Sequence, residues 1–456
     1  SETDEVDGAV LSSETILRGV SGREVLEELQ LDDDELSSSK HEARIMVVPN
    51  MLPTYIPLRL AQKILFIGES VQMLKDTENL KIHHYDENIG NLLQGRENDF
   101  LKTLHDLQER QEFSIPALEV EVDKIKACVA EQLWKLVVED ADLIKHLKLL
   151  KEMYLLGRGE LYLTLIDHLH TTMKGPPTTV MSYDISAAFK QSLAKILTYS
   201  EEYEDLFELK LDMKTDDQTS NEKFKSTWDL LQVQYNPPWP LHLLFTPSIM
   251  EKLNMLFTFL LKVRRTQIEL QGLWAFLMSA KRSGKIKMTS GPIWVLRRRM
   301  AFFIDNLQYY LQVDVLETQF SLLISKIHKT QSFENINRSL DNFLIEMLKQ
   351  SFVSMKKVFN ILHEIIYHCM AFCETVTSSD DLWDTSSKTE ERIERIAEEY
   401  NKQTSLLFTI LSSVRSHQTS PHLAQLLLRI DFNKFFTKKS AISMTSSSSS
   451  SSKDLL

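Results

Sequence analysis

Glycine and proline are scarce in this sequence, with 12 of each among 456 residues. A β-sandwich needs many turns and a nucleotide-binding fold needs glycine-rich loops, so this composition argues against both. Few helix breakers in a long chain with 43% hydrophobic residues favour long, packed helices. We therefore predict an all-α fold made of tandem helical bundles.

Cysteine is also rare, because only Cys128, Cys369 and Cys373 are present. Three cysteines cannot make a disulfide framework, and no secretory signal or membrane-length apolar run occurs. This predicts a cytosolic protein without a membrane partner. The net charge of -12 argues against a nucleic-acid partner. The sequence starts at Ser1 without an initiator methionine, from which we expect part of a longer protein.

Motifs that carry catalysis or nucleotide binding are missing as well. No GxSxG, no Walker loop and no kinase motif set occurs. The glycines of Gly157-Arg158-Gly159 lack the third glycine of a dinucleotide-binding turn, and they predict a tight joint between two helices. We therefore predict no catalytic residue and no cofactor site.

One histidine-containing segment resembles a zinc-protease helix only at first sight. His363 and His368 stand five residues apart, so on a helix their rings point about 140° apart and cannot share a metal ion. The nearby Cys369 and Cys373 share an apolar face and are expected to be buried and unreactive. We predict no metal site and no enzyme, and a hydrolase that uses His363 and Glu364 is the least favoured alternative.

The segment from Met300 to Ile327 is expected to be the central helix. At about 100° per residue, apolar side chains cover most of its circumference, which is typical of a helix inside a bundle. Arg297 to Arg299 form a basic collar before it. It is either a core helix or a helix whose collar and narrow polar stripe contact a partner. That stripe consists of Asp305, Gln308, Gln312 and Gln319.

Helical periodicity recurs along most of the chain, with one interruption. We expect single helices near residues 58–74, 94–111, 115–137, 143–154, 161–173, 182–198, 247–279, 392–414 and 421–436, and two helices within residues 333–374. Gly68, inside the first of them, predicts close approach of a neighbouring helix. Leu209–Met213 and Gln232–Phe245 instead show the pattern of a small antiparallel β-ribbon. Prolines 237, 238 and 240 confine its second strand to an edge.

The two ends of the chain have the composition of disordered segments. Residues 1–45 are acidic and rich in serine, which predicts a disordered acidic linker. Residues 441–456 contain an unbroken serine run at 446–452, which predicts a disordered Ser-rich tail.

Five long, ungapped blocks resemble the gamma-tubulin complex protein family, in the family's order, over roughly residues 46–436. The blocks are YIPLRLAQKILFIGESVQML (55–74), LWKLVVEDADLIKHLKLLKEMYLLGRGELYLTLID (133–167), WPLHLLFTPSIMEKLNMLFTFLLKVRRTQIEL (239–270), MAFFIDNLQYYLQVDVLETQF (300–320) and SLLFTILSSVRSHQTSPHLAQLLLRIDFNKFF (405–436).

The resemblance implies a function that the composition alone does not indicate. Members of this family stand side by side through an N-terminal helical domain, and each holds one gamma-tubulin on a C-terminal helical domain. A ring of them templates a microtubule at its minus end. Residues 46–112 resemble the end of the N-terminal, lateral-contact domain, and residues 113–440 resemble the gamma-tubulin-binding domain, with the β-ribbon inserted in it.

The same resemblance implies partners and a location. The partners would be gamma-tubulin and other gamma-tubulin complex proteins, without a cofactor. The location would be the cytoplasm and the cytoskeleton, at microtubule-organising centres such as the centrosome and the spindle pole. The alternative from another class is a helical adaptor or tether unrelated to tubulin, which would capture a different partner.

Basic and aromatic residues are the candidates for contact with gamma-tubulin, because tubulins are acidic. The alternative is that the arginines are a solvated helix end and that the tyrosines belong to the core. The candidates are Arg264, Arg265, Arg297, Arg298, Arg299, Tyr309 and Tyr310.

Overall fold

The computed structural model describes residues 52–53, 55–79, 96–109, 114–175, 177–197, 201–212, 226–283, 291–330, 332–378, 387–416, 421–432 and 434. Within these residues the chain is almost wholly helical, and the one sheet has two strands. The predicted all-α class with a small β-ribbon is confirmed. The predicted acidic linker and Ser-rich tail lie outside the described residues.

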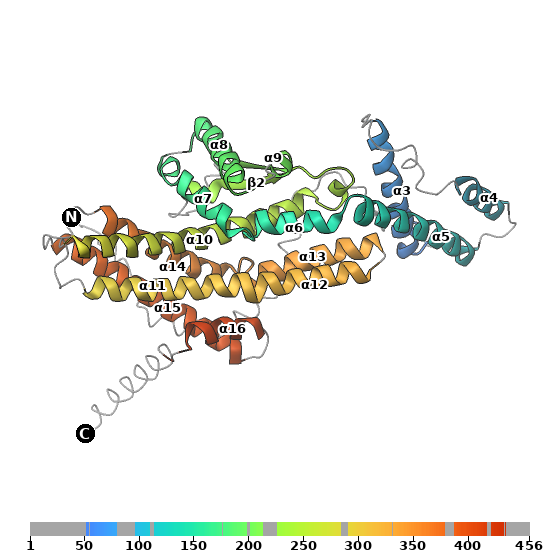
Figure 1. Ribbon diagram of the computed structural model, residues 1–456. Coiled ribbons are helices and arrows are strands. Elements are labelled where there is room, and N and C mark those ends of the chain that lie inside the picture. Colours follow the sequence, from blue (N-terminus) through green and yellow to red (C-terminus); the bar gives the residue numbers. More distant parts are fainter. Residues whose placement is uncertain are drawn as a thin grey trace, which may run out of the picture.

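The longest helices form an elongated bundle, which Figure 1 shows lengthwise. α10 (Pro247–Arg282) packs against α11 (Gly291–Tyr309) and α14 (Lys356–Ser378). α15 (Ser387–Ser416) packs along α14, and α16 (Pro421–Ile430) covers one side of the bundle, against α15 and α11. None of the helices in the described ranges is both long and apolar enough to cross a membrane.

Two helices begin where local sequence signals predict. α6 (Leu143–Tyr154) has the predicted bounds, and the carboxylate of Asp142 accepts a hydrogen bond from the Lys145 backbone N–H at 3.2 Å. α10 starts with Pro247 after an extended Thr246, although the Thr246 hydroxyl makes no capping hydrogen bond.

The predicted central helix lies inside the bundle but is not a regular α-helix. α11 ends at Tyr309, a π-helix, η6 (Tyr310–Glu317), follows, and α12 (Thr318–Lys329) continues to the antiparallel partner α13 (Phe333–Gln350). A π-helix changes the rotation of successive side chains, which periodicity at a constant 100° per residue does not anticipate.

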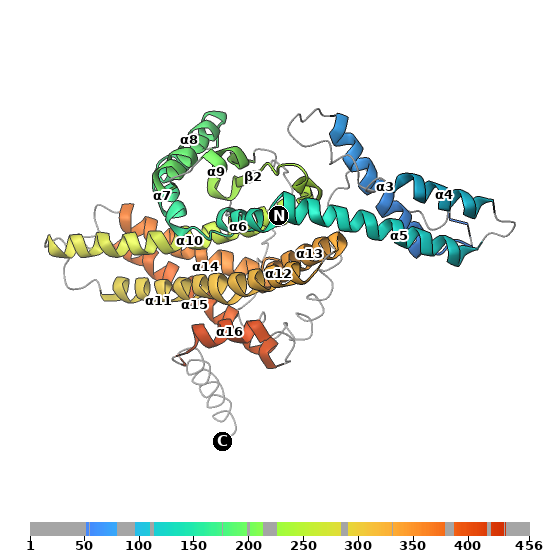
Figure 2. The same cartoon turned by 45° about the vertical axis from the view of Figure 1, so that its right-hand side comes forward.

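Three further helices lie at the other end of the molecule, as Figure 2 shows, and the third of them contacts α13 of the long bundle. α3 (Leu58–Asn79) and α4 (Glu97–Gln108) both contact α5 (Ile115–Trp134), which continues through the π-helix η2 (Lys135–Asp140) to α6. The expected close approach at Gly68 is wrong, because a Cβ atom there would meet nothing within 4 Å.

A tight joint after α6 leads to a group of shorter helices. The Gly157 backbone N–H donates to the Lys151 carbonyl at 3.1 Å, and an added Cβ would come within 3.1 Å of that oxygen. The tight joint predicted from the two glycines is therefore confirmed. α7 (Gly159–Leu169), α8 (Thr179–Ile196) and α9 (Glu201–Leu206) follow, and α9 was not predicted.

The β-ribbon pairs β1 (Phe207–Leu211) with β2 (Leu231–Tyr235) in antiparallel register, with Leu209 opposite Val233. The prediction that the second strand reaches Phe245 is wrong. The prolines after Tyr235 have no N–H for a ladder, so the chain leaves the sheet there. Short 3₁₀ turns lie at Thr172–Lys174 (η3), Thr227–Leu230 (η4) and Leu241–Leu243 (η5).

Candidate functional site

The arginine pair on α10 is engaged within the chain. The guanidinium of Arg265 lies 4.7 Å from the centre of the buried Trp228 ring, and burial lowers the pKa of Arg265. Nη1 of Arg264 donates to Oε1 of Gln267 at 2.6 Å. An arginine stacked on a buried tryptophan stabilises the packing of its own chain.

The basic collar before the central helix splits into residues with different roles. Nε of Arg297 donates to the Leu270 carbonyl at 3.1 Å, and Nη2 of Arg299 donates to Oδ1 of Asn401 at 2.6 Å. These two arginines therefore join α11 to α10 and α15. Arg298 is exposed and forms no ion pair within the described residues. Of the collar, only Arg298 is directed at solvent.

The two adjacent tyrosines have opposite environments. Tyr310 is 0% exposed, its hydroxyl donates to the Gln350 carbonyl at 2.9 Å, and its ring stacks on Phe352 at 5.7 Å. Tyr309 is 50% exposed, with the Arg429 guanidinium 4.3 Å from its ring centre. Tyr310 thus belongs to the core, and Tyr309 is available to a partner.

The polar stripe of the central helix is used largely inside the molecule. Oδ1 of Asp305 accepts from Gln267 at 2.7 Å. The side-chain amide of Gln312 donates to a backbone carbonyl of the joint after α6 at 3.3 Å, and that of Gln319 donates to Gln350 at 3.2 Å. These hydrogen bonds join the helix to its neighbours, and contact of the stripe with a partner stays a prediction.

A different face of α11 and η6 is open. Its residues on α11 follow one another at three-, four- and seven-residue steps, which keeps them within an arc of about 60°. One more residue of this face follows in η6, where the rotation per residue differs. Val295, Tyr309 and Val313 are 59%, 50% and 41% exposed. Arg298 is exposed, and Phe302 is half-buried. We call this set (Val295, Arg298, Phe302, Tyr309 and Val313) the α11 stripe.

α16 lies beside the α11 stripe. Two contacts hold it there, one between Arg429 and Asp314 and one between Phe302 and Phe432, and we call them the α16 clamp. Nε and Nη2 of Arg429 donate to the two carboxylate oxygens of Asp314 at 2.6 and 2.8 Å. The rings of Phe302 and Phe432 lie 5.8 Å apart. Sequence reasoning missed Arg429 and Phe432, because the clamp joins residues 115 positions apart and no local pattern signals it.

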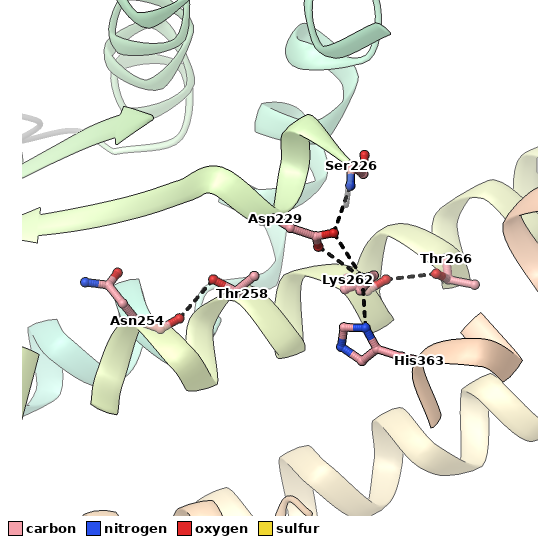
Figure 3. A network of polar contacts seen from close by, with 7 residues as sticks. All are labelled: Ser226, Asp229, Asn254, Thr258, Lys262, Thr266 and His363. Carbon is pink, nitrogen blue, oxygen red and sulfur yellow. Dashed lines mark hydrogen bonds and ion pairs between the residues drawn. The ribbon is translucent and has the colours of Figure 1, made fainter. Parts of the chain in front are cut away.

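A buried polar network links three elements of the C-terminal part (Figure 3). The Lys262 ammonium on α10 lies 3.1 Å from both carboxylate oxygens of Asp229 on η4, and it donates to Nδ1 of His363 on α14 at 3.2 Å. Lys262 can only donate, so His363 is neutral and carries its proton on Nε2. The carboxylate also accepts from the Ser226 backbone N–H at 3.0 Å.

This network predicts a dependence of stability on pH. Burial, and then the Lys262 ammonium, lower the pKa of His363 from 6.5 to about 4. Between these values the unfolded chain binds a proton that the folded chain does not. The free energy of unfolding should therefore fall by about 3 kcal/mol as the pH drops through this window.

Urea unfolding of the wild type and of His363→Gln at neutral pH and near the lower pKa checks this prediction. Glutamine keeps an acceptor for Lys262 but does not titrate, so the variant should lose that part of the pH dependence. Parallel pH profiles for the two proteins would contradict the assignment to His363.

The cysteines are buried, as predicted for Cys369 and Cys373. Burial raises the pKa of Cys373 to about 12, which keeps it a thiol. His363 is bonded to Lys262. Across the described ranges, no group of three or more His, Cys, Asp or Glu side chains could hold a metal ion.

Comparison with known protein families shows to which family this chain belongs. The family described as "Gamma tubulin complex component C-terminal" matches residues 143–436, and "Gamma tubulin complex component N-terminal" matches residues 11–140. The chain belongs to the gamma-tubulin complex component family. The α11 stripe, the α16 clamp and the buried network all lie within the residues that match the C-terminal description.

Curated relatives from animals and plants share this similarity. Gamma-tubulin complex component 4 of Mus musculus and of Homo sapiens are each 41% identical over 437 residues, which cover 92% of this chain and 64% of the relative. Component 4 of Arabidopsis thaliana is 29% identical over 456 residues, covering 85% of this chain and 60% of the relative. The chain thus spans less than two thirds of the length of these relatives.

Proposed function

We propose that this chain is a scaffold subunit of the gamma-tubulin complex that binds gamma-tubulin and supports microtubule nucleation at minus ends. The observation that carries the proposal is family membership across both matched regions, together with a long helical bundle that presents an open face on α11. A subunit of this kind acts by binding and positioning its partners, so we propose no enzymatic activity.

We further propose a division of labour along the chain. Residues 46–112 contact neighbouring gamma-tubulin complex proteins side by side, and residues 113–440 hold gamma-tubulin. The two matched regions meet between residues 140 and 143, and α5 packs with α3 and α4. The boundary at 112 stays a prediction. In the cell we expect the protein in the cytoplasm, at microtubule-organising centres such as the centrosome and the spindle pole.

Two of the candidate contact residues combine exposure with a shared face. Arg298 and Tyr309 both lie on the α11 stripe, whereas Arg265, Arg297, Arg299 and Tyr310 are engaged within the chain. We therefore propose Arg298 and Tyr309 as the contacts with gamma-tubulin.

Charge reversal at Arg298 tests this contact. Arg298→Glu should weaken gamma-tubulin binding about tenfold at low salt and reduce its salt dependence, because a charge at the rim of an interface steers association with an acidic partner. Lys190→Glu is the matched control, since Lys190 is exposed on α8 and the net charge changes equally. Equal weakening by both variants would show a non-specific charge effect and refute the contact.

Co-sedimentation of the chain with purified gamma-tubulin tests the function itself. A one-to-one complex is the expected result. If a chain that circular dichroism shows to be folded and helical forms no complex, the proposed function is wrong for this chain. An additional turbidity assay should show faster microtubule assembly from tubulin when both proteins are present.

A further inference from the structure

We propose that the π-helix η6 is a conformational switch that couples the docking of α16 to the joint between α6 and α7. In one state η6 is π-helical, α16 is clamped and the joint is closed, and this is the state of the structure. In the other state η6 is α-helical, its contact with α16 is broken and the joint is loosened. The coupling is a property of this chain alone and is independent of the proposed function.

η6 contacts α16 and the joint from neighbouring positions. Nε and Nη2 of Arg429 on α16 donate to the carboxylate of Asp314 at 2.6 and 2.8 Å. Two residues earlier, the side-chain amide of Gln312 donates to the Leu155 carbonyl at 3.3 Å. Two-point contact between guanidinium and carboxylate is strong and directional, so it fixes the rotation of η6. A rotation of this segment therefore changes both contacts together.

Glu317, the last residue of η6, holds α6 just before the joint. Its carboxylate oxygens lie 2.7 and 2.8 Å from the Lys151 ammonium. The Lys151 carbonyl accepts hydrogen bonds from the backbone N–H groups of Leu155 and Gly157, at 3.2 and 3.1 Å. Leu156 has a φ of 53°, a left-handed conformation that is unfavourable for leucine. Such a conformation persists only where surrounding contacts hold it, and η6 supplies contacts of this kind.

The π-helical form of η6 depends on contacts outside the helix. π-helices are mostly single turns, whereas η6 is eight residues long and lies between two α-helices. The hydroxyl of Thr318 donates to the Val313 carbonyl at 3.4 Å, which is the five-residue spacing of a π-turn. A π-turn encloses one residue more than an α-turn, so a change from π to α turns the side chains that follow by about 100°.

A small apolar pocket beside η6 gives space for this rotation. Its volume is about 20 Å³, and Lys151, Leu155, Phe320 and Leu323 are among the residues that line it. Phe320 and Leu323 lie on α12, directly after η6, and they would move when η6 turns. Protein interiors are close-packed, so a void beside the moving side chains makes repacking easier.

Hydrogen exchange of the whole chain tests the coupling. Arg429→Gln removes the two-point contact with Asp314, and the amides of Leu155 and Gly157 should then exchange about tenfold faster, because the joint opens when η6 turns. Asn401→Ala is the matched control. It removes a hydrogen bond between α11 and α15 without touching η6, and it should leave both amides at the wild-type rate. Exchange in α14 should stay unchanged in both variants.

A double variant distinguishes a switch from two independent contacts. Gln312→Ala should also raise exchange at the joint about tenfold, since it removes the hydrogen bond to the Leu155 carbonyl. Combined with Arg429→Gln, it should raise exchange no further than the stronger single variant, because Gln312 has already left Leu155 when η6 turns. An increase of about a hundredfold, the product of the two single effects, would show independent contacts and overturn the proposal.

Two further outcomes would contradict the coupling. If Arg429→Gln speeds exchange in α16 but not at the joint, the clamp holds α16 alone. If exchange in α14 rises as well, the variant has lost stability in general and η6 is no switch. Arg429→Lys keeps the charge and should give a smaller increase at the joint, and it replaces Arg429→Gln if circular dichroism shows that the latter is unfolded. None of these measurements involves gamma-tubulin, so they stand apart from the test of the proposed function.

Discussion

Tyr310→Ala is expected to lower the free energy of unfolding by about 3–5 kcal/mol, whereas Tyr309→Ala should change it by less than about 1 kcal/mol. The two tyrosines are neighbours in sequence, but Tyr310 is 0% exposed and Tyr309 is 50% exposed. Removing the buried ring leaves a cavity beside Phe352 and leaves the Gln350 carbonyl without its donor.

Urea unfolding followed by circular dichroism measures the loss of stability in both variants. Gamma-tubulin binding by the folded protein should instead be affected more by Tyr309→Ala than by Tyr310→Ala. Tyr309→Ala should weaken binding and keep the fold, while Tyr310→Ala should weaken the fold first. Tyr310→Phe isolates the hydroxyl and should cost about 1 kcal/mol. Equal destabilisation by the two alanine variants would contradict the assignment of Tyr310 to the core.

Lys262→Ala is expected to cost about 3 kcal/mol of stability. The Lys262 and Asp229 side chains are each 16% exposed, so the alanine leaves a largely buried carboxylate without its countercharge. Removing one partner of a buried ion pair costs more than the pair contributes, because the remaining charge keeps its desolvation penalty. The variant should also loosen η4 from the bundle, since Lys262 joins Asp229 to α10.

A double variant separates the ion pair from the loss of side-chain packing. Lys262→Ala with Asp229→Asn removes both charges, and asparagine still offers an oxygen to the Ser226 backbone N–H. The double variant should regain at least about half of the stability lost in Lys262→Ala. A loss below about 1 kcal/mol in the single variant would show that water replaces the ammonium without cost.

Much of the fold could be predicted from the sequence, because the residues that favour, begin and end a helix lie within a few positions of one another. The bounds of α6 follow from the helical spacing of its leucines. The proline after Thr246 marks the start of α10. The end of β2 was harder to predict, because alternating apolar residues continue beyond Tyr235 although the prolines remove the ladder donors.

The candidate site could be predicted only in outline. Arginine clusters and a tyrosine pair can be recognised in the sequence, but adjacent residues on a helix point about 100° apart, so a cluster in sequence is divided between core and surface. Arg299 reaches Asn401 and Arg298 faces solvent for this reason. Arg429 and Phe432 left no sequence signal of their role, since their contacts on α11 and η6 lie far away in the chain.

The sequence by itself determined the all-α class, the positions of most helices, the family and the burial of Cys369 and Cys373. These depend on composition, on periodicity and on short-range capping, which act between residues a few positions apart. Only the tertiary structure decided which arginine and which tyrosine remain exposed, that α16 clamps onto α11, and that Asp229, Lys262 and His363 form one network. The reason is physical: burial and ion pairing depend on which helices pack together, and the network joins residues 33 and 101 positions apart.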